Sequence, residues 1–129
     1  MMKKLIVIAM VTMLLVSILA IATAATLSDP VFDSATTFLT TTKKANFYAE
    51  TSSVQGSIKV TRVRLYKMVG DTWSYVGDLP VPTKESTNTI VFSTSYDYSG
   101  YIGSGTYRVY TTFSADGYTI SRYSNTRTY

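Results

Sequence analysis

Apolar and polar residues alternate along the chain from about residue 35 onward, in short runs separated by Gly, Pro, Asp and Ser. Alternation with a period of two is typical of a strand with one buried face, and no helical period occurs after residue 25. The pattern predicts about seven strands, at Ala35–Thr42, Ala45–Ser53, Ser57–Val69, Thr72–Gly77, Thr89–Ser95, Thr106–Phe113 and Tyr118–Ser124. Their number and spacing predict an all-β domain, either a sandwich or a small barrel.

The third predicted strand changes phase near its middle. Ile58 and Val60 share one face by alternation. Val63 and Leu65 fall on the opposite face unless one extra residue intervenes, because a one-residue slip moves every later side chain to the other side. A β-bulge or a strand break near Thr61 would keep all four apolar side chains buried.

The dipeptide Asp116-Gly117 predicts a tight hairpin, because a two-residue type I′ turn requires positive φ at both central positions. Counting outward from this turn pairs Phe113 with Ile120 and Tyr110 with Tyr123, and paired residues lie on the same side of a sheet. The predicted core face consists of Tyr107, Val109, Phe113 and Ile120. The predicted outward face consists of Arg108, Tyr110, Thr112, Thr119, Ser121 and Tyr123.

A second turn, at Gly70-Asp71, leaves two registers open. A loop of two or four residues pairs Tyr66 with Tyr75 and Met68 with Trp73, and all four side chains then point outward. A three-residue loop with a bulge would instead turn Trp73 and Tyr75 into the core. We favour the outward register.

The N-terminal residues resemble an export signal. Lys3 and Lys4 precede an uncharged 18-residue run, Leu5–Ala22, and Ala22-Thr23-Ala24 has the small-x-small spacing of a cleavage site. The alternative is an uncleaved membrane anchor, since 18 residues are just enough to span a bilayer. We therefore expect a signal helix at 1–25, a flexible leader at 26–34 and one β domain at 35–129. The protein is expected to be secreted, with membrane contact only through an uncleaved N-terminal segment.

Composition argues against most enzyme classes. The chain has no His and no Cys, which excludes Ser-His-Asp and Cys-His nucleophiles and His-ligated zinc. Four of the eight acidic residues, Asp71, Asp78, Asp97 and Asp116, occur in or beside predicted turns, where Asp is favoured for backbone reasons. No EF-hand loop or phosphate-binding loop is present. We expect no catalytic residue, no metal site and no cofactor.

The charge balance argues against nucleic acid as a partner. Without Lys3 and Lys4, ten basic side chains remain against eight acidic ones. Nucleic-acid binding proteins usually carry a clustered basic patch with a larger excess of positive charge.

Two segments carry a family resemblance. VRLYKMVGDTWSYVGDL and GSGTYRVYTTFSADGYTISRYS resemble small secreted proteins of Gram-positive bacteria, which are predicted to be immunoglobulin-like or fibronectin-III-like sandwiches and mostly have no assigned function. The resemblance covers roughly residues 35–129. It implies a single immunoglobulin-like β-sandwich of about seven antiparallel strands, although the Cys pair of antibody domains is missing. It brings no catalytic or ligand-binding residue.

YIGSGTYRVY is similar to the E–F corner of fibronectin-III domains, where a Gly-containing turn precedes a Tyr. By this likeness Tyr107 would be the corner tyrosine, with its hydroxyl bonded to nearby backbone.

In that topology the outward residues of four strands would share one surface. This aromatic–arginine face consists of Arg62, Arg64, Tyr66, Met68, Trp73, Tyr75, Arg108, Tyr110 and Tyr123. These residue types are enriched at binding interfaces, but cross-strand Tyr pairs also stabilise a sheet without any ligand. We expect a recognition module for a cell-surface glycan, a cell-wall polymer or a protein. The alternative is a structural or self-assembling protein with no small ligand, and the sequence does not predict an oligomeric state.

Overall fold

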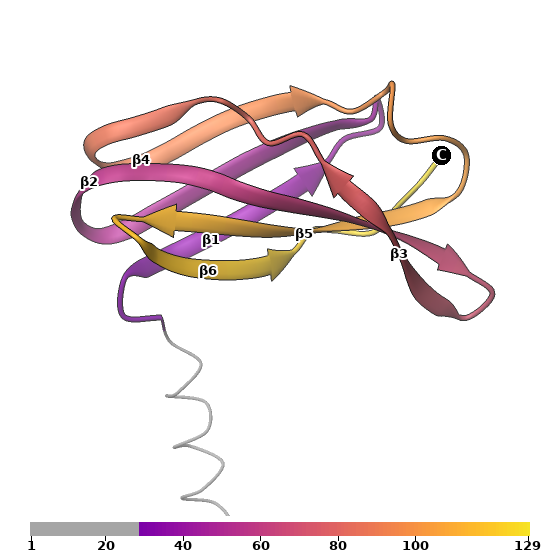
Figure 1. Ribbon diagram of the computed structural model, residues 1–129, viewed down its shortest axis with the longest axis horizontal. Helices are drawn as coiled ribbons and strands as arrows, with labels where there is room; N and C mark the ends of the chain where they lie inside the picture. Colours follow the sequence, from indigo (N-terminus) through magenta and orange to yellow (C-terminus); the bar gives the residue numbers. More distant parts are fainter. Residues whose placement is uncertain (1–28) are drawn as a thin grey trace, which may run out of the picture. The chain divides into compact units, whose positions relative to one another are not determined.

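The computed structural model describes residues 29–129, which form seven β-strands and no helix (Figure 1). The strands are β1 (Phe32–Leu39), β2 (Lys44–Val69), β3 (Thr72–Leu79), β4 (Glu85–Asp97), β5 (Thr106–Ala115), β6 (Tyr118–Tyr123) and β7 (Arg127–Thr128). The described residues accordingly include no helix of the length and apolarity that crossing a membrane would require. The predicted signal peptide at 1–25 lies outside the described residues.

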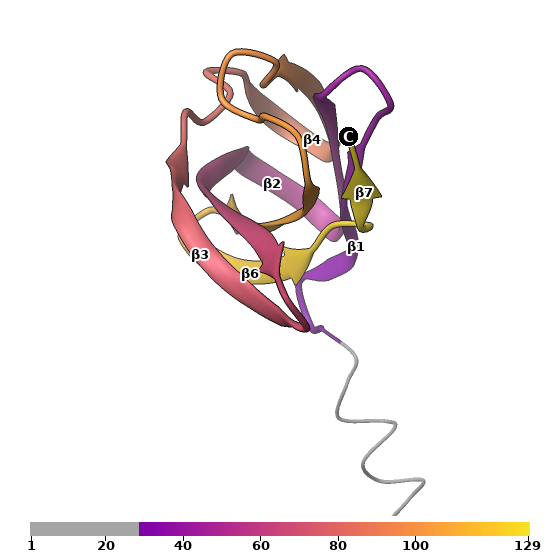
Figure 2. The same cartoon turned by 90° about the vertical axis from the view of Figure 1, so that its right-hand side faces the viewer.

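The 26-residue strand β2 belongs to two groups of strands. Its first part pairs with β1 along one edge and with β4 along the other, and its last part pairs with β5 and β3. β5 also pairs with β6 and β7, and every pairing is antiparallel. The first group is therefore β1, β2 and β4, and the second is β3, β2, β5 and β6 (Figures 1 and 2).

Sequence alternation predicts two strands where β2 is continuous. The interruption that suggests a break is real, because the pairing of β2 with β4 shifts register between Glu50 and Gln55. In this stretch β2 bends back on itself (Figure 1), although its residues remain one continuous strand. The phase change near Thr61 is a bulge in the pairing of β2 with β5, which is one of the two alternatives predicted from the sequence. Ile58, Val60, Val63 and Leu65 are consequently all buried.

Side chains from both groups meet in one hydrophobic core. Phe47 of β2 and Phe113 of β5 contact each other edge to face, with ring centroids 6.5 Å apart. Thr37 of β1 donates a buried hydrogen bond of 2.8 Å to Thr111 of β5. The buried apolar residues are Phe32, Leu39, Ala45, Phe47, Ala49, Ile58, Val60, Val63, Leu65, Leu79, Phe92, Tyr98, Ile102, Tyr107, Val109, Phe113, Ala115 and Ile120. The predicted all-β class and the predicted core face of β5 and β6 are confirmed.

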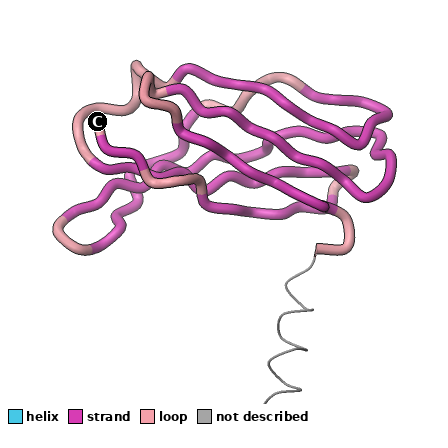
Figure 3. The backbone as a smooth tube through the Cα atoms, turned by 180° about the vertical axis from the view of Figure 1, so that it is seen from behind, coloured by secondary structure: helices cyan, strands magenta, loops and turns pink. Residues whose placement is uncertain are grey.

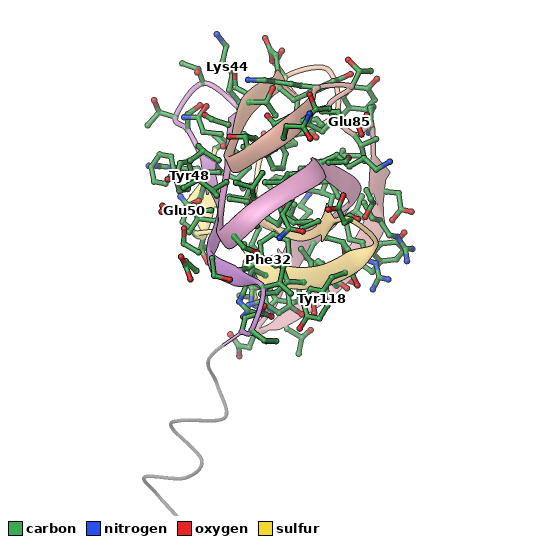
Figure 4. All side chains as sticks on the ribbon, turned by 90° about the vertical axis from the view of Figure 1, so that its left-hand side faces the viewer. Phe32, Lys44, Tyr48, Glu50, Glu85 and Tyr118 are labelled. Carbon is green, nitrogen blue, oxygen red and sulfur yellow. The ribbon has the colours of Figure 1, made fainter. Side chains whose placement is uncertain are left out.

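Strand ends differ from the predicted ones. β1 begins at Phe32 rather than Ala35, so it includes residues expected in the leader. The Phe32 ring is buried and lies 6.3 Å from that of Tyr118 (Figure 4), which holds this end of β1 in place. β4 begins at Glu85, four residues before the predicted Thr89, because its first residues pair with β2.

The C-terminal segment is bonded to the end of β1. Asn125 accepts a hydrogen bond from the Leu39 amide at 2.7 Å, and its side-chain amide donates to the Leu39 carbonyl at 3.1 Å. The Tyr129 hydroxyl donates to the Thr40 carbonyl at 2.6 Å. The two-residue strand β7, which has no alternation of its own to predict it, is placed by these contacts and by its pairing with β5.

Candidate functional site

The nine residues of the aromatic–arginine face come together on the outward side of β3, β2, β5 and β6. On β2 and β3, Tyr66 pairs with Tyr75 and Met68 with Trp73. The outward register of the Gly70-Asp71 hairpin is therefore the observed one. This hairpin projects beyond the other strands (Figures 1 and 3).

The neighbouring strands complete the same surface. Arg64 pairs with Tyr110 and Tyr66 with Arg108 across β2 and β5. Tyr110 pairs with Tyr123 across β5 and β6, as counting from Asp116-Gly117 predicts. The ninth residue, Arg62, pairs with Thr112 on the same side of the sheet.

Arg108 lies at the centre of the face between two aromatic rings. Its guanidinium carbon is 4.4 Å from the Trp73 ring centroid and 3.9 Å from that of Tyr123. Contacts of this kind are cation–π interactions, which strengthen as the cation is removed from water. Because Arg108 is half-buried, the two rings fix its guanidinium in one position.

The remaining rings are joined to this centre. Tyr123 lies 4.4 Å from Tyr110 and 6.0 Å from Tyr66, between ring centroids. Tyr66 in turn lies 5.7 Å from Tyr75, and the Arg64 guanidinium lies 5.9 Å from the Tyr110 ring. Four strands thus contribute to one continuous network of rings and guanidinium groups.

A shallow hollow of about 260 Å³ opens beside this network, lined by Arg62, Arg64, Tyr66 and Tyr75. At its side, the carboxylate of Asp78 accepts hydrogen bonds from the Tyr75 hydroxyl at 2.8 Å and from Arg62 Nε at 3.1 Å. The Tyr75 hydroxyl and then the Arg62 guanidinium hold the pKa of Asp78 below its ordinary value. The same carboxylate raises the pKa of Tyr75.

Asp78 lies beside the aromatic–arginine face, although the sequence pattern predicts it in or beside a turn. β3 continues to Leu79, and Asp78 lies opposite Arg64 in the ladder. A one-residue bulge at Val76 produces this register, since Leu65 pairs with Gly77 and Tyr66 with Tyr75. Counting from the turn without the bulge pairs Leu65 with Val76 and therefore does not place Asp78 opposite Arg64. The one signal in the sequence for the ion pair of Asp78 with Arg62 is their opposite charge in or beside neighbouring predicted strands.

Positive charge is in excess on this surface. Within residues 29–129 the one ion pair is Arg62 with Asp78, and neither Arg64 nor Arg108 lies within ion-pair distance of a carboxylate. Arg64 is opposite Asp78 in the ladder, and its charge also helps to lower the pKa of that carboxyl. The Nε atoms of Arg64 and Arg108 are buried and make no hydrogen bond. This arrangement can bind an anionic group. Residues 29–129 also contain no cluster of three or more His, Cys, Asp or Glu side chains suited to a metal ion.

Tyr107 lies outside the face, on the core side of β5. It is buried, and its hydroxyl donates to the Ser104 carbonyl at 3.2 Å, the local backbone contact that its likeness to a corner tyrosine implies. Two residues before Tyr107, Gly105 has φ +136°, a backbone conformation that residues with a Cβ rarely adopt, so this turn favours glycine.

No protein-family model, no curated protein and no solved structure matches this chain. The resemblance to small secreted proteins of Gram-positive bacteria stays a prediction.

Proposed function

We propose that this protein is a non-enzymatic extracellular recognition module, and that its aromatic–arginine face binds a glycan, a cell-wall polymer or a protein. The observation that carries the proposal is the convergence of nine interface-type side chains from four strands, two of them arginines that form no ion pair among the described residues. The proposed architecture is a single immunoglobulin-like β-sandwich. The two groups of strands with one core between them and the local bond of Tyr107 support it.

The face is both accessible and rigid. Tyr75 is 52% exposed and Tyr123 is 49% exposed, so a large aromatic area remains in contact with water. At the same time, ring and guanidinium contacts hold Tyr123 and Arg108 in place before any ligand arrives. Side chains that are already ordered lose little conformational entropy on binding, which favours affinity.

Trp73 provides a direct test, because it is the single tryptophan of the chain and belongs to the face. Its fluorescence is recorded while neutral polysaccharides, acidic polysaccharides and polypeptides are added to the protein. We expect at least one class of polymer to change the emission with saturation. The Tyr75→Ala variant should lose this response.

The matched control is Tyr101→Ala, which removes a tyrosine of similar exposure, 56%, from the loop between β4 and β5. This control variant should respond to the polymer like the unchanged protein. If no class of polymer alters Trp73 emission, or if Tyr75→Ala and Tyr101→Ala respond alike, the aromatic–arginine face is not a recognition surface.

A second candidate function is self-assembly through β4. This strand pairs with β2 along one edge, and no strand among the described residues pairs with its other edge. Ile90 and Val91 on β4 are each 39% exposed, and Val54 of β2 is 67% exposed. Lys84 donates to the Ser93 carbonyl at 2.6 Å and so covers one position of β4. The rest of an edge with exposed apolar side chains favours pairing between copies. Sedimentation over a wide concentration range tests this, and a strictly monomeric protein contradicts it.

A further inference from the structure

The ring faces at the centre of the aromatic–arginine face are partly occupied by the protein itself. The guanidinium of Arg108 lies over Trp73 and over Tyr123, and Tyr110 packs close to Tyr123. A neutral sugar held mainly by stacking needs an uncovered ring face. The face therefore offers less stacking surface than its number of aromatic residues indicates.

The aromatic–arginine face has more hydrogen-bond donors than acceptors and more cationic than anionic groups. A guanidinium carries five N–H donors and no acceptor, and it matches the oxygens of a carboxylate or phosphate in pairs. The one carboxylate at the face, Asp78, already accepts hydrogen bonds from Arg62 and Tyr75. Arg64 lines the same hollow and has no ion-pair partner within the described residues, so it is the cation available to a ligand.

The hollow has room for about one unit of a polymer rather than for a whole oligomer, since its volume equals that of roughly nine liquid waters. Its volume of about 260 Å³ is below the range of pockets that enclose drug-sized molecules, roughly 300–1,000 Å³. It is also open to solvent along the sheet. An extended chain could therefore continue across the face on both sides of a group bound in the hollow.

The character of the surroundings favours a polysaccharide over a protein. Protein interfaces are also rich in Tyr, Trp, Met and Arg, so these residue types alone do not distinguish the two kinds of ligand. The phenol hydroxyls of Tyr66, Tyr110 and Tyr123, however, make no hydrogen bond within the described residues, so three donor–acceptor groups remain for a ligand rich in hydroxyls. The face also presents an indole N–H and guanidinium groups. Groups of this kind can hydrogen-bond the closely spaced hydroxyls of a sugar chain.

From these observations we propose that the ligand of the face is an acidic polysaccharide, and that the hollow between Arg62, Arg64, Tyr66 and Tyr75 receives one of its anionic groups against Arg64. This inference rests on the proposed function of the same face. It adds the chemical class of the ligand and the residue that recognises its charge.

The experiment compares three polymers by Trp73 fluorescence. Polygalacturonate supplies a sugar chain with carboxylates, its methyl ester supplies the same chain without the charge, and poly-L-glutamate supplies carboxylates without sugar. We expect polygalacturonate to bind at least about tenfold more tightly than either of the other two polymers. Added salt should weaken this binding, because exposed charges are screened.

Three variants locate the effect on the face. Arg64→Gln should weaken polygalacturonate binding about tenfold, since a charge-assisted hydrogen bond is lost. Arg122→Gln is the matched control, because Arg122 is exposed on the opposite side of β6 and, within residues 29–129, its side chain donates only to the Ser121 carbonyl. Arg122→Gln should weaken polygalacturonate binding less than about twofold, because it changes only the net charge of the protein. Asp78→Asn should strengthen binding, because it releases Arg62 for the ligand.

The outcomes separate this inference from the proposed function. Equal binding of polygalacturonate and its methyl ester would overturn the acidic ligand and leave the face a glycan-binding surface. Equal binding of poly-L-glutamate would show that an acidic protein is the occupant. Equal losses in Arg64→Gln and Arg122→Gln, or weaker binding by Asp78→Asn, would remove the hollow as the site. If no polymer of any class changes Trp73 emission, the proposed function fails as well.

Discussion

Arg108 should couple energetically to Tyr123, and this coupling measures how much the aromatic–arginine face contributes to stability. The perturbation is a double-mutant cycle of Arg108→Met and Tyr123→Leu. Methionine keeps most of the aliphatic stem that packs on the sheet, while it removes the guanidinium that lies between the two rings.

The magnitude follows from the geometry. A cation–π contact contributes about 0.5–1 kcal/mol when exposed and about 2 kcal/mol when desolvated. Arg108 is half-buried and has two such contacts, but its Nε is buried without a hydrogen-bond partner, which offsets part of the gain. We expect Arg108→Met to lower the free energy of unfolding by about 1–2 kcal/mol. The coupling with Tyr123 should be about 1 kcal/mol.

Urea unfolding followed by Trp73 fluorescence and by circular dichroism measures both quantities. A loss of 1 kcal/mol corresponds to a fall in Tm of about 4–8 °C for a domain of this size. The control is a cycle of Arg108→Met with Tyr101→Ala, which should be additive within about 0.5 kcal/mol because these residues share no contact. A coupling between Arg108 and Tyr123 below about 0.3 kcal/mol, within the additivity of unlinked sites, would refute a stabilising role for the stacked guanidinium.

Three further predictions concern contacts outside the face. Tyr98→Phe should cost about 1 kcal/mol, because the buried hydroxyl donates to the Pro80 carbonyl at 2.7 Å. Burial also raises the pKa of Tyr98 above its ordinary 10.0. The unfolded chain therefore loses this proton at a lower pH than the folded protein, and the free energy of unfolding falls as the pH rises beyond 10. Above pH 10 the denaturant midpoint of Tyr98→Phe should fall less steeply than that of the unchanged protein. Asn125→Ala should lower Tm by removing both hydrogen bonds to Leu39, at a cost of about 1–3 kcal/mol, whereas unchanged melting would show that the C-terminal segment adds no stability. Gly105→Ala should destabilise by about 1 kcal/mol or more in calorimetry because of its φ of +136°, and a neutral result would contradict the preference for glycine at this turn.

Local patterns in the sequence were enough to assign faces within a hairpin. Alternation separates buried from exposed positions, and Asp116-Gly117 sets the register of the strands on either side. For this reason Tyr110 opposite Tyr123 and Phe113 opposite Ile120 were predicted and observed. A phase change near Thr61 is also visible in the residues themselves, but the sequence left a bulge and a strand break open, and the pairing of β2 with β5 shows the bulge.

Strand lengths and ends depended on distant partners. Alternation around residues 51–56 does not show that β2 continues, since pairing with β4 resumes only at Gln55. Phe32 belongs to β1 because its ring packs near Tyr118, which is 86 residues away in the chain. Contacts of such range leave no signal in a local window of sequence.

The sequence by itself determined which side chains of the Asp116-Gly117 hairpin lie on the same side, because this depends only on alternation and a tight turn. The pairing of β2 with β5, which joins the two hairpins into one aromatic–arginine face, exists only in the tertiary structure. The tertiary structure alone decided which ion pairs and which cation–π contacts these residues form. The bulge at Val76 moves Asp78 into the ladder opposite Arg64, and its carboxylate forms an ion pair with Arg62, while Arg64 makes none within the described residues. The adjacency of β2, β3, β5 and β6 places Arg108 between two rings contributed by the two outer strands. Stacking and ion pairing depend on distances between strands, and those distances exist only once the sheet has formed.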